Sequence, residues 1–105
     1  MEDEINQKIQ IIVNQIDKLH IEDPTIFVHW DGLTKILTRD EISTIIFLQN
    51  LKDEHLIKHV SSVFEEISSN LQSKKFIETI EFLEQKFKHL KLHYMVEAAK
   101  NAMED

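Results

Sequence analysis

Several residue types on which many folds and active sites depend are absent or rare in this chain of 105 residues. Cysteine is absent, which excludes disulfide bonds, zinc–thiolate sites and a thiol nucleophile. Only one glycine, Gly32, and one proline, Pro24, occur. Phosphate-binding loops need several glycines, so a P-loop and a dinucleotide-binding fingerprint are excluded. Tight hairpin turns also rely on glycine, and an all-β fold is therefore disfavoured.

The chain also lacks the segments that direct a protein to or through a membrane. No apolar run approaches the roughly 18–20 residues that a membrane-spanning helix needs, so we expect no membrane association. The first residues, MEDEINQK, are acidic and polar, whereas a secretory signal begins basic and then turns apolar. The missing cysteine fits a reducing compartment. Together these features predict a cytoplasmic protein.

Basic residues are too few to balance the acidic ones, and the imbalance is confined to one part of the chain. The formal net charge is −7, and residues 1–70 hold 13 acidic and 6 basic side chains, whereas residues 71–105 hold six of each. Nucleic-acid binding is disfavoured, because it requires Lys and Arg against phosphates. A basic protein partner would be attracted to such a surface. The alternative is an acidic surface that serves only solubility.

The chain does have a helical spacing of apolar residues over most of its length. Apolar side chains recur every three or four positions, as one buried helix face requires. Helices are expected at about residues 5–19, 24–37, 39–50, 53–71, 73–90 and 92–103. We therefore predict one all-α domain over residues 1–105, with five or six antiparallel amphipathic helices joined by short connections. A short stack of HEAT-like helical hairpins and a compact helical bundle both fit this pattern.

Polar residues at the expected helix starts support these boundaries. Thr38 and Glu41, three residues apart, have the form of a capping box. Asp23, Asp53 and Ser73 are expected to cap the second, fourth and fifth helices.

Two apolar stripes predict which large side chains are buried. Leu83 lies on the stripe of the fifth helix and is expected in the core, whereas Phe82 points about 120° away from it. Trp30 is in register with Ile26 and Leu33, which favours its burial.

Two histidines form the strongest candidate for metal chemistry. His55 and His59 are four residues apart and share a helix face, with Glu66 as a conceivable third ligand. The HExxH pattern is absent, and two solvated histidines on an outer face are the commoner arrangement. A Gly-x-Ser-x-Gly elbow is absent too, and adjacent carboxylates diverge by about 100° on a helix. We therefore expect no metal site, no cofactor and no enzymatic activity.

Acidic side chains form the candidate partner-binding face. Glu54, Glu65 and Glu66 are expected on the outer side of the helix over 53–71, and Asp31 and Glu41 are candidates for the same face. The alternative is an ordinary solvated face. First-turn carboxylates such as Glu41 and Glu54 also interact favourably with the helix dipole.

Two segments, FLQNLKDEHLIKHVSSVFEEI and NLQSKKFIETIEFLEQKF, are followed by VEAAKNAM. Their apolar run, Leu-x-Asp turn and paired-acid helix make residues 24–103 similar to small, acidic, HEAT-like helical proteins of bacteria that accompany secreted polymorphic toxins. The resemblance implies an immunity protein, a non-enzymatic inhibitor that binds and occludes a cognate toxin domain. A nuclease toxin would suit, because its cleft must be basic to hold phosphates. No site residue is implied by motif, since immunity faces vary with the toxin. A structural or regulatory helical module that self-associates remains the alternative.

Overall fold

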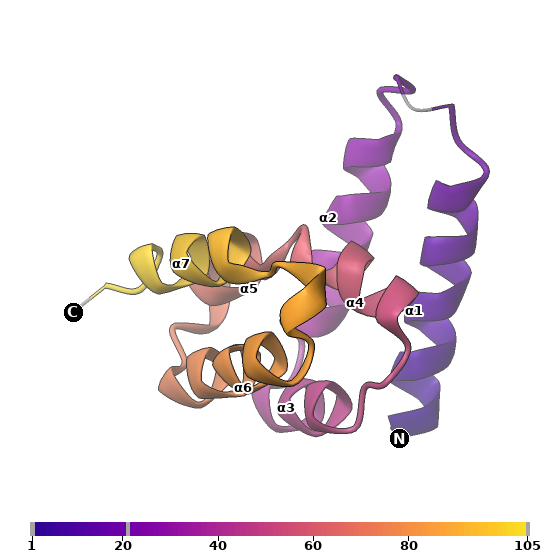
Figure 1. The fold of residues 1–105 in the computed structure, drawn as a ribbon. Coiled ribbons are helices and arrows are strands. Elements are labelled where there is room, and N and C mark those ends of the chain that lie inside the picture. The colour runs from indigo at the N-terminus through magenta and orange to yellow at the C-terminus, as the bar shows by residue number, and fades with distance from the viewer. Residues whose placement is uncertain (1, 21, 105) are drawn as a thin grey trace.

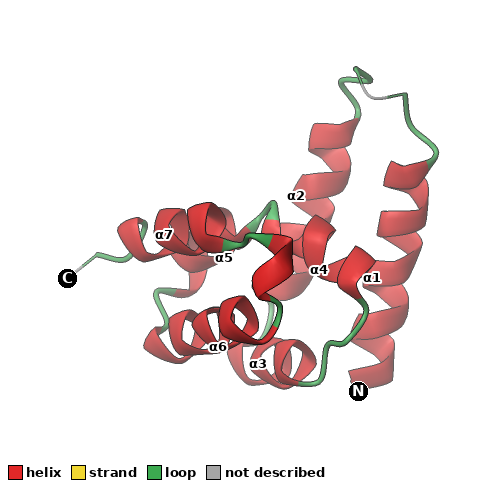
Figure 2. Cartoon of the chain, in the orientation of Figure 1, coloured by secondary structure: helices red, strands yellow, loops and turns green. Residues whose placement is uncertain are grey.

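The computed structural model of the protein describes residues 2–20 and 22–104, and its regular structure there is helical (Figure 2). Within these ranges the chain forms seven α-helices, one short 3₁₀-helix and no strand. In chain order they are α1 (Glu2–Asp17), α2 (Ile26–Leu37), α3 (Glu41–Gln49), α4 (Glu54–Ser61), α5 (Phe64–Leu71), α6 (Lys74–Lys86), η1 (Lys88–Leu90) and α7 (His93–Asn101), as Figure 1 shows. The all-α prediction is confirmed, although the α-helices number seven rather than five or six. None of these helices combines the length and the apolarity that crossing a membrane requires.

The helices pack both on their neighbours in sequence and on helices further along the chain. α1 pairs with α2, its neighbour in sequence, and this hairpin stands beside the remaining helices (Figure 1). α3 packs mainly on α6, and α5 on α7, although neither pair is consecutive. The helices form a compact helical bundle, with extents of 37 × 29 × 26 Å.

The fourth helix expected from the sequence is broken into α4 and α5 at Ser62–Val63. The N–H groups of Ser62 and Val63 donate to carbonyls three residues earlier, at 3.2 and 3.0 Å, which tightens the chain into a 3₁₀-like turn. The hydroxyls of Ser61 and Ser62 both donate to the carbonyl of Lys58, and such local bonds compete with the helical ladder. The break allows the adjacent Val63 and Phe64 both to be buried.

One hydrophobic core connects the helices. Near its centre, the rings of Phe64 and Phe76 meet edge to face with centroids 6.0 Å apart. Leu83 is fully buried, as predicted. Phe82 points away from the buried stripe and is 51% exposed. Trp30 is only partly buried and packs on the edge of the core, so its predicted burial is incomplete. The other fully buried large side chains include Ile9, Leu33, Leu37, Leu48, Ile57, Ile67, Ile80 and Leu92.

Two of the predicted helix caps are confirmed. The carboxylate of Asp53 accepts from the N–H groups of His55 and Leu56, at 3.0 and 3.3 Å, and starts α4. The Oγ atom of Ser73 accepts from the N–H of Phe76 at 3.1 Å and starts α6. Both bonds satisfy N–H groups that a helix start leaves without an internal partner.

The predicted starts of α2 and α3 are displaced. Asp23 accepts from the N–H of Thr25 at 2.9 Å, but α2 begins only at Ile26. The capping box at Thr38 is wrong, because Asp40 caps α3 through the N–H of Ile42 at 3.1 Å. The hydroxyl of Thr38 instead donates backwards to a carbonyl at the end of α2. Asp40, two positions after Thr38, is therefore the residue that caps α3.

We expect Ser73→Ala to lower the free energy of unfolding by about 0.5–2 kcal/mol. The substitution leaves the N–H of the buried Phe76 without its acceptor and also removes the hydroxyl that donates to Glu41. Ser69→Ala, at an exposed position within α5, is the control and should change stability by less than about 0.5 kcal/mol. Urea unfolding followed by circular dichroism measures both, and equal midpoints for the two variants would contradict the cap.

Candidate functional site

A groove between α2 and α5 brings together two of the predicted partner-binding residues. Asp31, on α2, and Glu66, on α5, are both exposed and both line it. The groove has a volume of about 440 Å³. It is lined by Phe27, Trp30, Asp31, Thr34, Ser62, Val63, Glu66, Ser69 and Asn70. Carboxylates and apolar surface therefore lie side by side at one open site.

An aromatic pair forms one edge of this groove. The rings of Phe27 and Trp30 meet edge to face with centroids 5.4 Å apart, and Phe27 is 65% exposed. Asp31, beside them, forms an ion pair with Lys35 one turn later, at 3.0 Å. Such an exposed pair on one helix is weak, so the Asp31 carboxylate can exchange this partner for another. Aromatic residues are enriched in protein–protein interfaces relative to the rest of the surface.

The remaining predicted partner-binding residues are exposed but are spread over other helices. Glu65 is adjacent to Glu66 in the first turn of α5. Glu54 lies on α4 and pairs with His89 at 2.9 Å. Glu41 accepts a hydrogen bond from Ser73. Because α4 and α5 are separate helices, Glu54 does not share a helix face with Glu65, and its carboxylate and that of Glu41 already have partners within the chain.

His55 and His59 meet a carboxylate that the sequence pattern did not indicate. The Nε2 atoms of His55 and His59 lie 2.7 and 3.1 Å from the two carboxylate oxygens of Asp17. The two imidazole rings are edge to face, with centroids 4.8 Å apart. The hydrogen bond from His55 holds the pKa of the Asp17 carboxyl below its ordinary value. Glu66, the acid considered from the sequence, lies instead on α5 in the groove.

No local signal in the sequence marks Asp17 as the partner of these histidines. It precedes His55 by 38 residues and comes from a different helix. Only the packing of α1 against α4 brings the three side chains together.

The second pair of histidines with the same spacing is arranged differently. His89 lies in η1 and pairs with Glu54, whereas His93 begins α7 and pairs with Glu84 at 2.9 Å. The two imidazoles therefore face different carboxylates. The four-residue spacing alone therefore does not distinguish His89 and His93 from His55 and His59.

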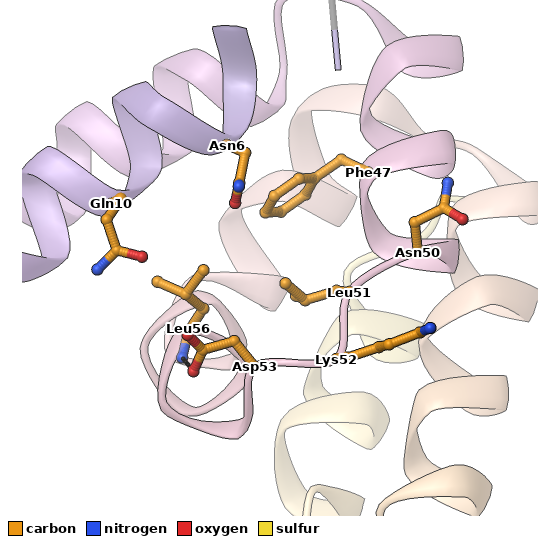
Figure 3. Close-up of a pocket in the computed structure, with 8 residues that line it drawn as sticks. All are labelled: Asn6, Gln10, Phe47, Asn50, Leu51, Lys52, Asp53 and Leu56. Atoms are coloured by element: carbon orange, nitrogen blue, oxygen red, sulfur yellow. Dashed lines mark hydrogen bonds between the residues drawn. The ribbon is translucent and has the colours of Figure 1, made fainter. Parts of the chain in front are cut away.

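A small hollow between α1, α3 and α4 is lined by amide and apolar side chains (Figure 3). Its volume is about 260 Å³. Asn6 and Gln10 face Phe47 and Leu56 across it (Figure 3). The carboxylate that lines it belongs to Asp53, which is engaged as the α4 cap. We therefore do not assign general acid or base chemistry to this hollow.

No family model matches the sequence, and comparison with curated proteins and with solved structures gives no match either.

Proposed function

We propose that this protein is a non-enzymatic, cytoplasmic protein-binding inhibitor of the immunity type, which occludes a basic toxin domain. The observation that carries the proposal is the α2–α5 groove, where Asp31 and Glu66 flank apolar surface edged by Phe27 and Trp30. Glu65, exposed beside Glu66, extends the acidic surface.

The carboxylates and the aromatic residues of the groove contribute to binding in different ways. The carboxylates and the net charge of −7 attract a basic partner over a distance and accelerate its association. The aromatic edge supplies the apolar contact that slows dissociation, since buried aromatic anchors carry much of the binding energy of an interface. A nuclease cleft would complement this surface, because it must be basic to hold phosphates.

Growth rescue tests the proposal directly. We expect a neighbouring gene to encode a large secreted protein with a toxic domain, and this domain is expressed in a host cell with or without the full chain. We expect growth only with the chain, and a stable complex of the two purified proteins in size-exclusion chromatography. A chain that neither restores growth nor forms a complex with that domain would refute the immunity role.

Self-association is a second candidate, and a specific observation favours it. Phe27 and Val28 are adjacent at the start of α2 and are 65% and 69% exposed, so they present apolar surface that a second copy of the chain could cover. If this surface joins two copies, sedimentation should show a dimer that dissociates in the Phe27→Ser/Val28→Ser variant. If the wild type is still monomeric at about 100-fold the concentration used for partner binding, self-association is contradicted. The surface would then be free for another protein.

A further inference from the structure

We propose that Asp17, His55 and His59 bind a divalent transition-metal ion of the Zn²⁺ type, which would connect the end of α1 to α4. This inference is independent of the groove between α2 and α5. It rests on three donor atoms that converge on one point.

The distances fit a metal site. The His55 and His59 Nε2 atoms are 2.7 and 3.1 Å from separate oxygens of Asp17, and one donor atom from each residue lies within 4.8 Å of the others. Donors of a tetrahedral zinc ion, at about 2.0–2.1 Å from the metal, lie roughly 3.3 Å from one another. Small side-chain rotations therefore convert the observed cluster into a ligand set.

The helices position these donors from two directions. His55 and His59 are one turn apart on α4, where side chains at i and i+4 lie on the same face. Asp17 approaches from α1, which packs against α4. Two ligands from one helix and a third from its neighbour form a site that exists only in the folded chain.

The electrostatics of α1 also favour a cation at this point. Asp17 is the last residue of α1, and the last turn contains no basic residue. A carboxylate at a helix C-terminus lies at the negative end of the helix dipole, which is unfavourable without a compensating positive charge. In the metal-free molecule an ionised carboxylate can only accept, so each hydrogen bond to Asp17 requires the hydrogen of that imidazole on Nε2. When a metal ion binds, the single hydrogen of each neutral imidazole moves to Nδ1 through solvent, and the Nε2 lone pair becomes the ligand.

The donor set indicates the class of metal. Two imidazoles and one carboxylate suit Zn²⁺ and its neighbours Co²⁺, Ni²⁺ and Cu²⁺, whereas Ca²⁺ and Mg²⁺ prefer oxygen donors alone. The side chain of His59 is 20% exposed and that of His55 is 55% exposed, so solvent reaches the site and water can complete the coordination.

Calorimetric titration of the tag-free full chain with Zn²⁺ tests the site, and Co²⁺ serves as an absorbing probe of its coordination. We expect one bound ion per chain. Asp17→Ala and His59→Ala should each weaken Zn²⁺ binding by at least about 10-fold. Losing an outer-shell partner of a ligand already lowers metal affinity by about 10–100-fold, and losing the ligand itself should lower it at least as much. The control is His89→Ala/His93→Ala, which removes the other pair with the same spacing and should leave the affinity unchanged.

Thermal unfolding provides a second measurement. A ligand that binds only the folded chain raises its melting temperature. At one fixed Zn²⁺ concentration, Zn²⁺ should therefore raise the midpoint of the wild type and of the His89/His93 control by similar amounts, and that of Asp17→Ala by clearly less. Circular dichroism checks that each variant is folded. If the wild type does not saturate with Zn²⁺, or if the Asp17 and His59 variants bind it as well as the wild type does, the cluster is an ion pair only and the proposal fails.

Discussion

Phe64→Ala is expected to lower the free energy of unfolding by about 3–5 kcal/mol. Phe64 is fully buried at the start of α5 and meets Phe76 of α6 edge to face. Truncation removes the buried ring and leaves a cavity where helices from different parts of the chain meet. Domains of this size have total stabilities of about 5–15 kcal/mol, so the loss is a large share of the total.

The melting temperature of the Phe64→Ala variant should fall by about 12–25 °C, since the unfolding entropy of a chain of this length converts 1 kcal/mol into roughly 4–5 °C. Phe82→Ala is the matched control, because it removes the same ring from a position that is 51% exposed. It should shift the midpoint by only a few degrees. Differential scanning calorimetry of both variants compares them, and similar shifts would contradict the assignment of Phe64 to the core.

The burial of Phe64 also illustrates where sequence reasoning succeeded and where it stopped. The apolar spacing of residues 53–71 predicts one buried stripe, Leu56, Val60, Val63, Ile67 and Leu71. The first four are buried, whereas Leu71 is only partly buried. The spacing did not predict the turn at Ser62–Val63, because no glycine or proline marks it. The serine hydroxyls and the packing around the turn decide the break, and those contacts depend on the rest of the fold.

Helix starts were predictable where one residue alone could act as the cap. Asp53 and Ser73 have no second capping residue within two positions and cap α4 and α6 as expected. Between α2 and α3, Thr38 and Asp40 are two residues apart and both can cap. The carbonyl at the end of α2 occupies the Thr38 hydroxyl, so Asp40 takes the role.

The candidate sites depend on contacts between distant segments, which a single sequence does not encode locally. The excess of acid in residues 1–70 indicated where carboxylates gather, but not that Asp31 and Glu66 would line one groove. The spacing of His55 and His59 indicated a shared helix face, but not that Asp17 would face it. In both cases the residue that the sequence pattern did not indicate comes from a second helix. The apolar spacing is compatible with several pairings of the helices, so it does not show which helix that is.

The variant Asp31→Lys/Glu66→Lys should bind its basic partner more slowly, with an association rate at low salt reduced by about 10-fold or more. Both side chains are exposed, so the fold should remain intact and the stability should change by less than about 0.5 kcal/mol for each substitution. The two changes replace negative charge by positive charge on both sides of the groove. Steering of the partner is then lost, and with it most of the dependence of the association rate on salt.

The control variant, Glu78→Lys/Glu104→Lys, changes the net charge by the same amount at exposed positions that do not line the groove. Surface plasmon resonance at two salt concentrations separates a local effect of the groove from an effect of overall charge. If the site is the α2–α5 groove, the groove variant should lose far more association rate than the control. Equal losses would assign the attraction to the whole acidic surface. If the groove variant keeps the wild-type association rate and salt dependence, the groove is not the interface, which would then lie on another face, such as the one that carries Phe82 and Lys86.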